Sequence, residues 1–130
     1  MPPAGSGHPG REVHVDEAMA ERLADTMFAL SSPSRVLILG CLLGGSRSVS
    51  NLTESLGMEQ SAVSHQLRVL REHNLVRAEW AGRRRLYALY DEHVAALVYA
   101  GLDHVNRAEA GSPALTHRRS VPDRGVEDAS

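Results

Sequence analysis

The sequence has a single cysteine, Cys41, no lysine, and few aromatic residues, which make up 4% of its 130 residues. One cysteine excludes an intramolecular disulfide and a zinc site built from paired cysteines. No apolar run approaches the roughly 18 residues that a membrane span requires, so we expect no membrane partner. Residues 1–13 lack both a basic start and an apolar stretch, unlike a secretory signal, and we therefore expect a cytoplasmic protein.

The net charge of −2 hides an uneven distribution of charge along the chain. Residues 1–30 carry two arginines and five acidic residues, and residues 86–110 carry one arginine and four acidic residues, so each segment has a charge of −3. Residues 47–85 carry seven arginines and four glutamates, a charge of +3. A basic middle segment between acidic flanks favours contact with phosphates in the middle and other roles at the flanks.

The composition predicts one folded domain between two disordered tails. Residues 1–14 and 111–130 have too little apolar content to order alone, which leaves residues 15–110 as the domain. Helical periodicity predicts a first helix from about Asp16 to Ala29 and a second from Ser32, with Pro33 at its first position, to Gly44–Gly45. Apolar residues nearly encircle the second helix, so we expect it to be buried, with Cys41 as a small core residue.

The middle of the chain predicts a helix-turn-helix followed by a hairpin. A short helix capped at Ser50 and stopped by Gly57 precedes a longer helix within residues 58–74. The period then changes to two, which predicts strands at 76–80 and 85–90 around a turn at 81–84, before a last helix that begins near Asp91. This order predicts a mainly α fold with a small β-hairpin, the winged helix-turn-helix.

The longer helix has one polar face and one apolar face, as a helix that enters the major groove requires. Val63, Leu67 and Leu70 recur on the apolar face. Each polar residue alone is typical of a solvated surface, but the order of elements and the local positive charge favour binding to double-stranded operator DNA. The predicted DNA-binding residues are Gln60, Ser61, Ser64, His65, Gln66, Arg68, Arg83, Arg84 and Arg85. The first and last helices carry further apolar stripes, which predict a homodimer through these helices.

Three segments resemble one known family: ALSSPSRVLILGCL, VSNLTESLGMEQSAVSHQLRVLREHNLV and AGRRRLYALYDEHV. They resemble the ArsR/SmtB family of bacterial metal-responsive repressors, and its actinobacterial nickel- and cobalt-sensing branch most of all. The resemblance covers roughly residues 16–108 and is strongest over residues 57–71. It implies a homodimeric repressor on a palindromic operator, where metal binding lowers operator affinity and releases transcription of export or homeostasis genes.

The resemblance also implies where an inducing metal binds. Ser48-Val49-Ser50 replaces the family's Cys-x-Cys pair, which removes a soft-metal site. On the last helix the resemblance implies Asp91, His93 and His104 as ligands, with Arg107 in place of a fourth. The two histidines share a helix face about 16 Å apart along the axis, so only two antiparallel chains bring both to one ion.

Imidazole and carboxylate donors favour Ni(II) or Co(II), with Zn(II) as an alternative. Further donors are available in the tails at His8, His14 and His117. Two other interpretations stay open: Asp91 is only a helix cap and the histidines are solvated, or the site has decayed and a partner co-regulator or another signal controls DNA binding. An enzyme is not supported, because the sequence has no nucleophile elbow, phosphate loop or closely spaced carboxylate pair.

Overall fold

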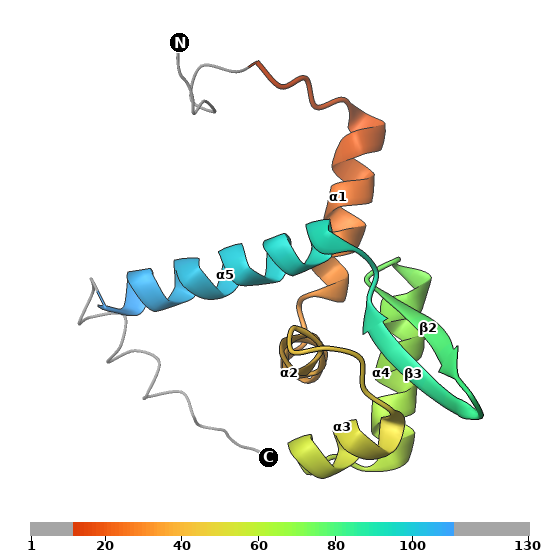
Figure 1. Ribbon diagram of the computed structural model, residues 1–130. Coiled ribbons are helices and arrows are strands. Elements are labelled where there is room, and N and C mark those ends of the chain that lie inside the picture. The colour runs from red at the N-terminus through yellow and green to blue at the C-terminus, as the bar shows by residue number, and fades with distance from the viewer. Residues whose placement is uncertain (1–11, 111–130) are drawn as a thin grey trace, which may run out of the picture.

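The computed structural model describes residues 12–110. Most of the two predicted tails, with His8 and His117, lies outside the described residues. Five helices and one hairpin follow each other in the predicted order, which confirms the winged helix-turn-helix (Figure 1). The elements are α1 (Glu17–Ala29), α2 (Pro33–Leu42), α3 (Val49–Leu56), α4 (Gln60–Glu72), β2 (Val76–Ala81), β3 (Arg84–Leu89) and α5 (Glu92–Ala110).

Side-chain caps set the starts of the helices. Asp16 accepts a hydrogen bond from the Met19 amide at 2.8 Å, and Ser32 caps α2, so both predicted starts are confirmed. The start of α3 differs from the prediction, because its N-cap is Ser48 and not Ser50. The Ser48 hydroxyl accepts from the Asn51 amide at 3.1 Å while the Asn51 carboxamide oxygen accepts from the Ser48 amide. This reciprocal pair stabilises the earlier start.

The core lies where α2, α3, α4 and the hairpin meet. Its largest fully buried side chains are Ile38, Leu39, Leu52, Val63, Leu67 and Leu70. Helix α2 ends at Leu42, earlier than predicted, and it is not buried all round, since Leu37 is 53% exposed. The elements packed against α2 leave Leu37 uncovered, so the expectation of a completely buried helix is wrong for the single chain. Cys41 is half-buried against the core, as expected.

The hairpin is a two-stranded antiparallel sheet with β2 paired to β3 from Val76↔Leu89 to Ala81↔Arg84. Its turn is shorter than predicted, because Gly82 has a φ of +66° and allows a two-residue turn. A single bridge also joins β3 to the segment before α3: Arg47 and Tyr87 exchange backbone hydrogen bonds of 2.9 and 2.7 Å. The hairpin of β2 and β3, which is the wing of this fold, is thereby fixed beside the start of α3.

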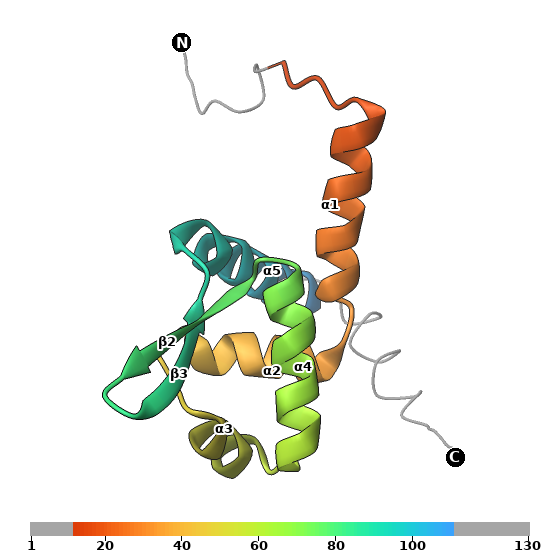
Figure 2. The same cartoon turned by 90° about the vertical axis from the view of Figure 1, so that its right-hand side faces the viewer.

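Helices α1 and α5 lie at the margin of this core, to which they contribute Ala29, Val94 and Val98. Figures 1 and 2 show α1 projecting away from the rest of the domain, while α5 runs across it from the end of β3. Several of their large apolar side chains are more than half exposed, among them Leu23, Phe28 and Tyr99. Within residues 12–110, none of the helices combines the length and the apolar character needed to cross a membrane.

Candidate functional site

Helix α4 presents a polar surface on the side opposite the core. Val63, Leu67 and Leu70 are buried beneath it. Arg68 and His65 are linked on this surface, since Arg68 Nη2 lies 3.1 Å from His65 Nδ1. The exposed face gathers five of the predicted DNA-binding residues, Gln60, Ser61, Ser64, His65 and Arg68. These are small hydroxyls and hydrogen-bonding groups on a rigid element, the kind of surface that enters a major groove.

Gln66 does not belong to this surface. It is half-buried, and its carboxamide oxygen accepts a hydrogen bond of 2.9 Å from Arg35 Nη1. Arg35 also donates from Nε to the Ala29 carbonyl at 2.6 Å and from Nη2 to the Phe28 carbonyl at 3.3 Å. The Gln66 carboxamide is thus engaged with Arg35, while the other five predicted residues of α4 are exposed. Arg35 joins the end of α1 to α4, a role that the sequence analysis missed.

The wing presents its three consecutive arginines to solvent. Arg83 lies in the turn, and Arg84 and Arg85 begin β3. The guanidinium carbon of Arg85 lies 6.0 Å from the centre of the Trp80 ring and 5.5 Å from that of Tyr87. Beside the wing is a hollow, formed together with the start of α3 and lined by Ser48, Val49, Ser50, Asn51, Arg84, Arg85 and Tyr87.

A carboxylate secures the hairpin to the loop that precedes α3. The Ser46 hydroxyl donates to Glu79 Oε2 at 2.7 Å, and Arg77 Nη1 pairs with Glu79 Oε1. The hydrogen bond from Ser46, and then the one from Arg77, hold the pKa of Glu79 below its ordinary value. Glu79 is therefore ionised near neutral pH, and it connects β2 to residue 46 by a charge-assisted hydrogen bond.

The predicted metal ligands lie along α5. Asp91 Oδ1 accepts the Val94 amide at 3.0 Å and so caps the helix, while Asp91 Oδ2 lies 3.7 Å from His93 Nδ1. The His93 side chain is 96% exposed, and His104 is also exposed. In one chain, over residues 12–110, no three histidine, cysteine or acidic side chains gather closely enough to hold a metal ion. A single chain thus offers Asp91 with His93, and His104 separately.

Two further residues bear on this site. Arg107 Nε pairs with Asp103 Oδ2 at 3.0 Å, one turn away on the same helix, so its charge is partly compensated beside His104. His14 is exposed before α1, and its Nε2 lies 4.0 Å from Glu12 Oε1. Within residues 12–110, His14 and Glu12 do not form part of a cluster of three side chains that could hold a metal ion.

The sequence and the fold match known regulators. Residues 32–78 match the family described as "Bacterial regulatory protein, arsR family". The HTH-type transcriptional regulator NmtR of Mycobacterium tuberculosis is 46% identical over 110 residues, which cover 82% of this chain and 92% of that protein. This chain belongs to the ArsR family.

Solved structures agree with this assignment. The solution structure of apo-NmtR superimposes with a TM-score of 0.63 over 79% of this chain and 89% of that one. A homodimeric winged helix-turn-helix DNA-binding domain from Mycobacterium bovis, a possible ArsR-family regulator, is 28% identical with a TM-score of 0.66, over 74% of this chain and 91% of that one. As an ArsR-family protein, this chain is a DNA-binding transcriptional regulator and not an enzyme.

Proposed function

We propose that this ArsR-family chain is a homodimeric repressor whose affinity for a palindromic operator falls when a divalent metal binds between its last helices. Ni(II) or Co(II) suits this role, with Zn(II) as an alternative. The observation that carries the proposal is the division of the surface: a polar α4 face and an arginine wing on the helix-turn-helix, against an exposed apolar surface with histidine and aspartate on α5. Binding to operator DNA also implies a cytoplasmic location.

For DNA binding, α4 lies in the major groove and the wing contacts the backbone. Ser64 and His65 are exposed in the middle of α4, where side chains reach base edges. Arg68 and the wing arginines carry fixed positive charge, which suits phosphate oxygens. Sequence recognition and general affinity are therefore assigned to different residues, and substitutions separate the two.

Replacing Ser64 or His65 with alanine is expected to change which DNA sequence is preferred. Loss of a base contact costs about 5- to 150-fold in discrimination at the affected position, because each good contact contributes about 1–3 kcal/mol. Selection from a random duplex library by wild type and variants measures the preference directly. Ser55→Ala, at an exposed serine of α3, is the matched control. A uniform loss on all sequences would remove both residues from base recognition.

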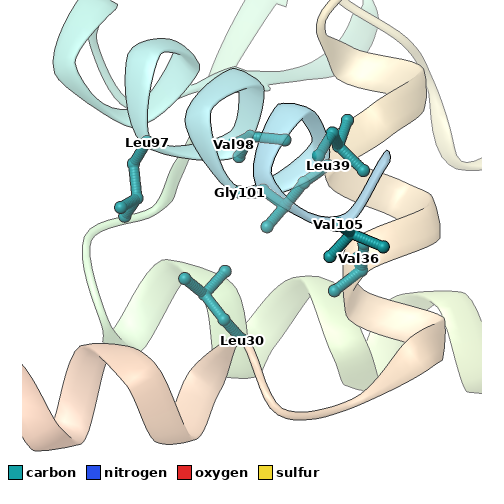
Figure 3. Close-up of a pocket in the computed structure, with 8 residues that line it drawn as sticks. Leu30, Val36, Leu39, Leu97, Val98, Gly101 and Val105 are labelled. Atoms are coloured by element: carbon teal, nitrogen blue, oxygen red, sulfur yellow. The ribbon is translucent and has the colours of Figure 1, made fainter. Parts of the chain in front are cut away.

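The proposed homodimer covers the apolar surface of α1 and α5. An isolated helix as short as α1, of 13 residues, is marginal in water, and within one chain α1 projects from the core (Figure 2). At its end lies an apolar pocket of about 220 Å³, and Figure 3 shows residues of α2 and α5 around it, together with Leu30, which directly follows α1. The pocket is lined by Leu30, Val36, Leu39, Leu97, Val98, Gly101, Leu102 and Val105. A second copy is the occupant that fits, since the similar Mycobacterium bovis domain is homodimeric.

The donors present on α5 fit a borderline divalent ion. Asp91 and His93 are neighbours at the start of the helix, and His104 lies about 16 Å further along its axis. An antiparallel copy of α5 brings His104 of one chain to Asp91 and His93 of the other. A bound ion then supplies a bond between subunits that exists in only one arrangement of the dimer, and this differential affinity is what a metal-operated switch requires.

A mixed dimer tests whether the site is shared between chains. A chain with Asp91→Ala and His93→Ala is paired with a chain carrying His104→Ala. Each homodimer of these variants is expected to bind no metal, because each lacks part of both sites. The mixed dimer retains one complete set of donors, so we expect half the wild-type metal stoichiometry in calorimetry. A mixed dimer that binds no metal, or a wild-type monomer in solution, would contradict the shared site.

The operator response completes this test. In His104→Ala, metal is expected to leave operator affinity unchanged, while affinity without metal stays at the wild-type value. Arg107→His, by contrast, adds a possible metal ligand one turn from His104, and we expect it to increase the affinity for metal. If the wild type binds its operator without responding to metal, Arg107 marks a decayed site, and the alternative holds: regulation by a partner protein or another signal.

A further inference from the structure

The wing holds the only tryptophan of the chain, Trp80, and that side chain is 67% exposed. Single exposed apolar residues are ordinary on protein surfaces. Trp80, however, is paired directly across the hairpin with Arg85, and the guanidinium carbon of Arg85 lies 6.0 Å from the centre of its ring. This distance is within the range of a cation–π contact, for which tryptophan is the best aromatic partner.

A second ring contacts the same guanidinium. Tyr87 follows Arg85 by two residues on β3, so both side chains lie on one face, and the distance from the guanidinium carbon to the ring centre is 5.5 Å. Tyr87 is only 9% exposed. Its backbone amide donates a hydrogen bond to the Arg47 carbonyl, and its carbonyl accepts one from the Arg47 amide. The tyrosine ring is therefore held in place, whereas the Trp80 ring, which contacts Arg85 from β2, is exposed.

Arg85, held in this way, borders the hollow between the wing and the start of α3, which Arg84 also lines. We propose that Trp80 is a positioning residue for Arg85, and that its indole holds the guanidinium ready for a DNA backbone phosphate. The inference rests on the proposed function, because it takes the wing to contact DNA. A free arginine side chain loses rotamer freedom when it binds a phosphate, and a side chain that is already ordered loses less.

The test compares Trp80→Leu with Trp80→Phe, which differ in whether a ring remains. Binding to a labelled random duplex of about 30 base pairs is followed by anisotropy between about 50 and 200 mM salt, where phosphate contacts dominate. We expect Trp80→Leu to weaken binding by about 2- to 5-fold per wing, hence about 5- to 30-fold for a dimer that uses two wings. Trp80→Phe is expected to recover most of this loss.

The dependence on salt separates positioning from direct contact between Trp80 and DNA. Arg85→Ala is expected to lower the slope of log affinity against log salt by about 1.8 for the dimer. If Trp80 acts through Arg85, Trp80→Leu lowers this slope as well, although it removes no charge. In an Arg85→Ala background the same substitution is then expected to cost nothing further. An equal loss in both backgrounds, with an unchanged slope, would overturn the inference.

The outcomes also separate this inference from the proposed function. A wild-type protein that binds no duplex overturns both, whereas a wild type that binds and a Trp80→Leu variant that binds equally well overturns the positioning role alone. Thermal unfolding without DNA checks that the variants fold, as the exposure of Trp80 leads us to expect. Should Trp80→Leu unfold, Arg85→Lys replaces it, because lysine keeps the charge without planar stacking on the rings. Unchanged affinity in Arg85→Lys contradicts the proposal.

Discussion

Replacing Arg83 and Arg84 together with alanine is expected to weaken binding to every DNA duplex, whatever its sequence. Both side chains are exposed at the tip of the wing, and neither has a carboxylate partner among the ion pairs between described residues. Each arginine that neutralises a phosphate releases about 0.9 counterion. Removing two arginines from each chain of a dimer thus lowers the slope of log affinity against log salt by up to about 3.6, and affinity near 0.1 M salt by up to roughly 10³-fold.

The measurement is a salt titration of affinity for an unrelated duplex, with Arg22→Ala as the control. Arg22 is an exposed arginine of α1, outside the helix-turn-helix and the wing, and we expect its removal to leave the slope unchanged. A wing variant with the wild-type slope would show that the wing does not contact phosphates. Arg83 lies in the turn, and Arg84 pairs with Ala81, one position nearer the turn than the pair of Trp80 and Arg85. Removal of Arg83 and Arg84 is therefore expected to leave the aromatic contacts of Arg85 in place.

The helix-turn-helix and the wing were predictable because local signals set them. Pro33 at the start of α2, Gly57 with a φ of +65° after α3, and the change of period after residue 75 each act within a few residues. Local patterns also placed Val63, Leu67 and Leu70 on the buried side of α4, as the structure confirms. The exposed side of α4 then follows from the geometry of one helix.

Features that depend on distant residues were not predictable in this way. Gln66 is adjacent to His65 in sequence, yet it turns toward Arg35, which lies 31 residues earlier. The exposure of Leu37 on α2 likewise depends on how segments that are distant in the sequence pack together. The same holds for the hydrogen bond between Ser46 and Glu79. Periodicity reports which face of a helix is apolar, but it carries no information about which neighbour covers that face.

The proposed metal site depends on residues outside the single chain. Helical rise alone separates His93 from His104, so the sequence predicts that one chain cannot complete the set. In the structure, one carboxylate oxygen of Asp91 caps α5 and the other lies near His93. Asp103 pairs with Arg107. Capping and metal binding by Asp91 are therefore compatible, because they use different oxygen atoms.

The second large effect is expected inside the domain. Leu67 lies on α4, on the side opposite the proposed DNA-binding face, and is 1% exposed within the cluster that joins α2, α3 and α4. Leu67→Ala is expected to lower the free energy of unfolding by about 2–5 kcal/mol, since it removes buried carbon and leaves a cavity that helices cannot fully close. A domain of this size has only about 5–15 kcal/mol of stability, so the loss is a large fraction of it.

Urea unfolding followed by circular dichroism measures this effect, at one fixed protein concentration because dimerisation shifts apparent stability. Ser64→Ala is the matched control: it lies on the same helix, faces solvent, and is expected to change stability by less than about 0.5 kcal/mol. The two variants therefore separate stability from recognition. Ser64→Ala is expected to alter the preferred DNA sequence without changing stability, whereas Leu67→Ala is expected to lower stability. A loss below about 1 kcal/mol in Leu67→Ala would mean that the core beneath α4 repacks. Other contacts, such as the hydrogen bond from Arg35 to Gln66, would then hold the exposed face of α4 in place.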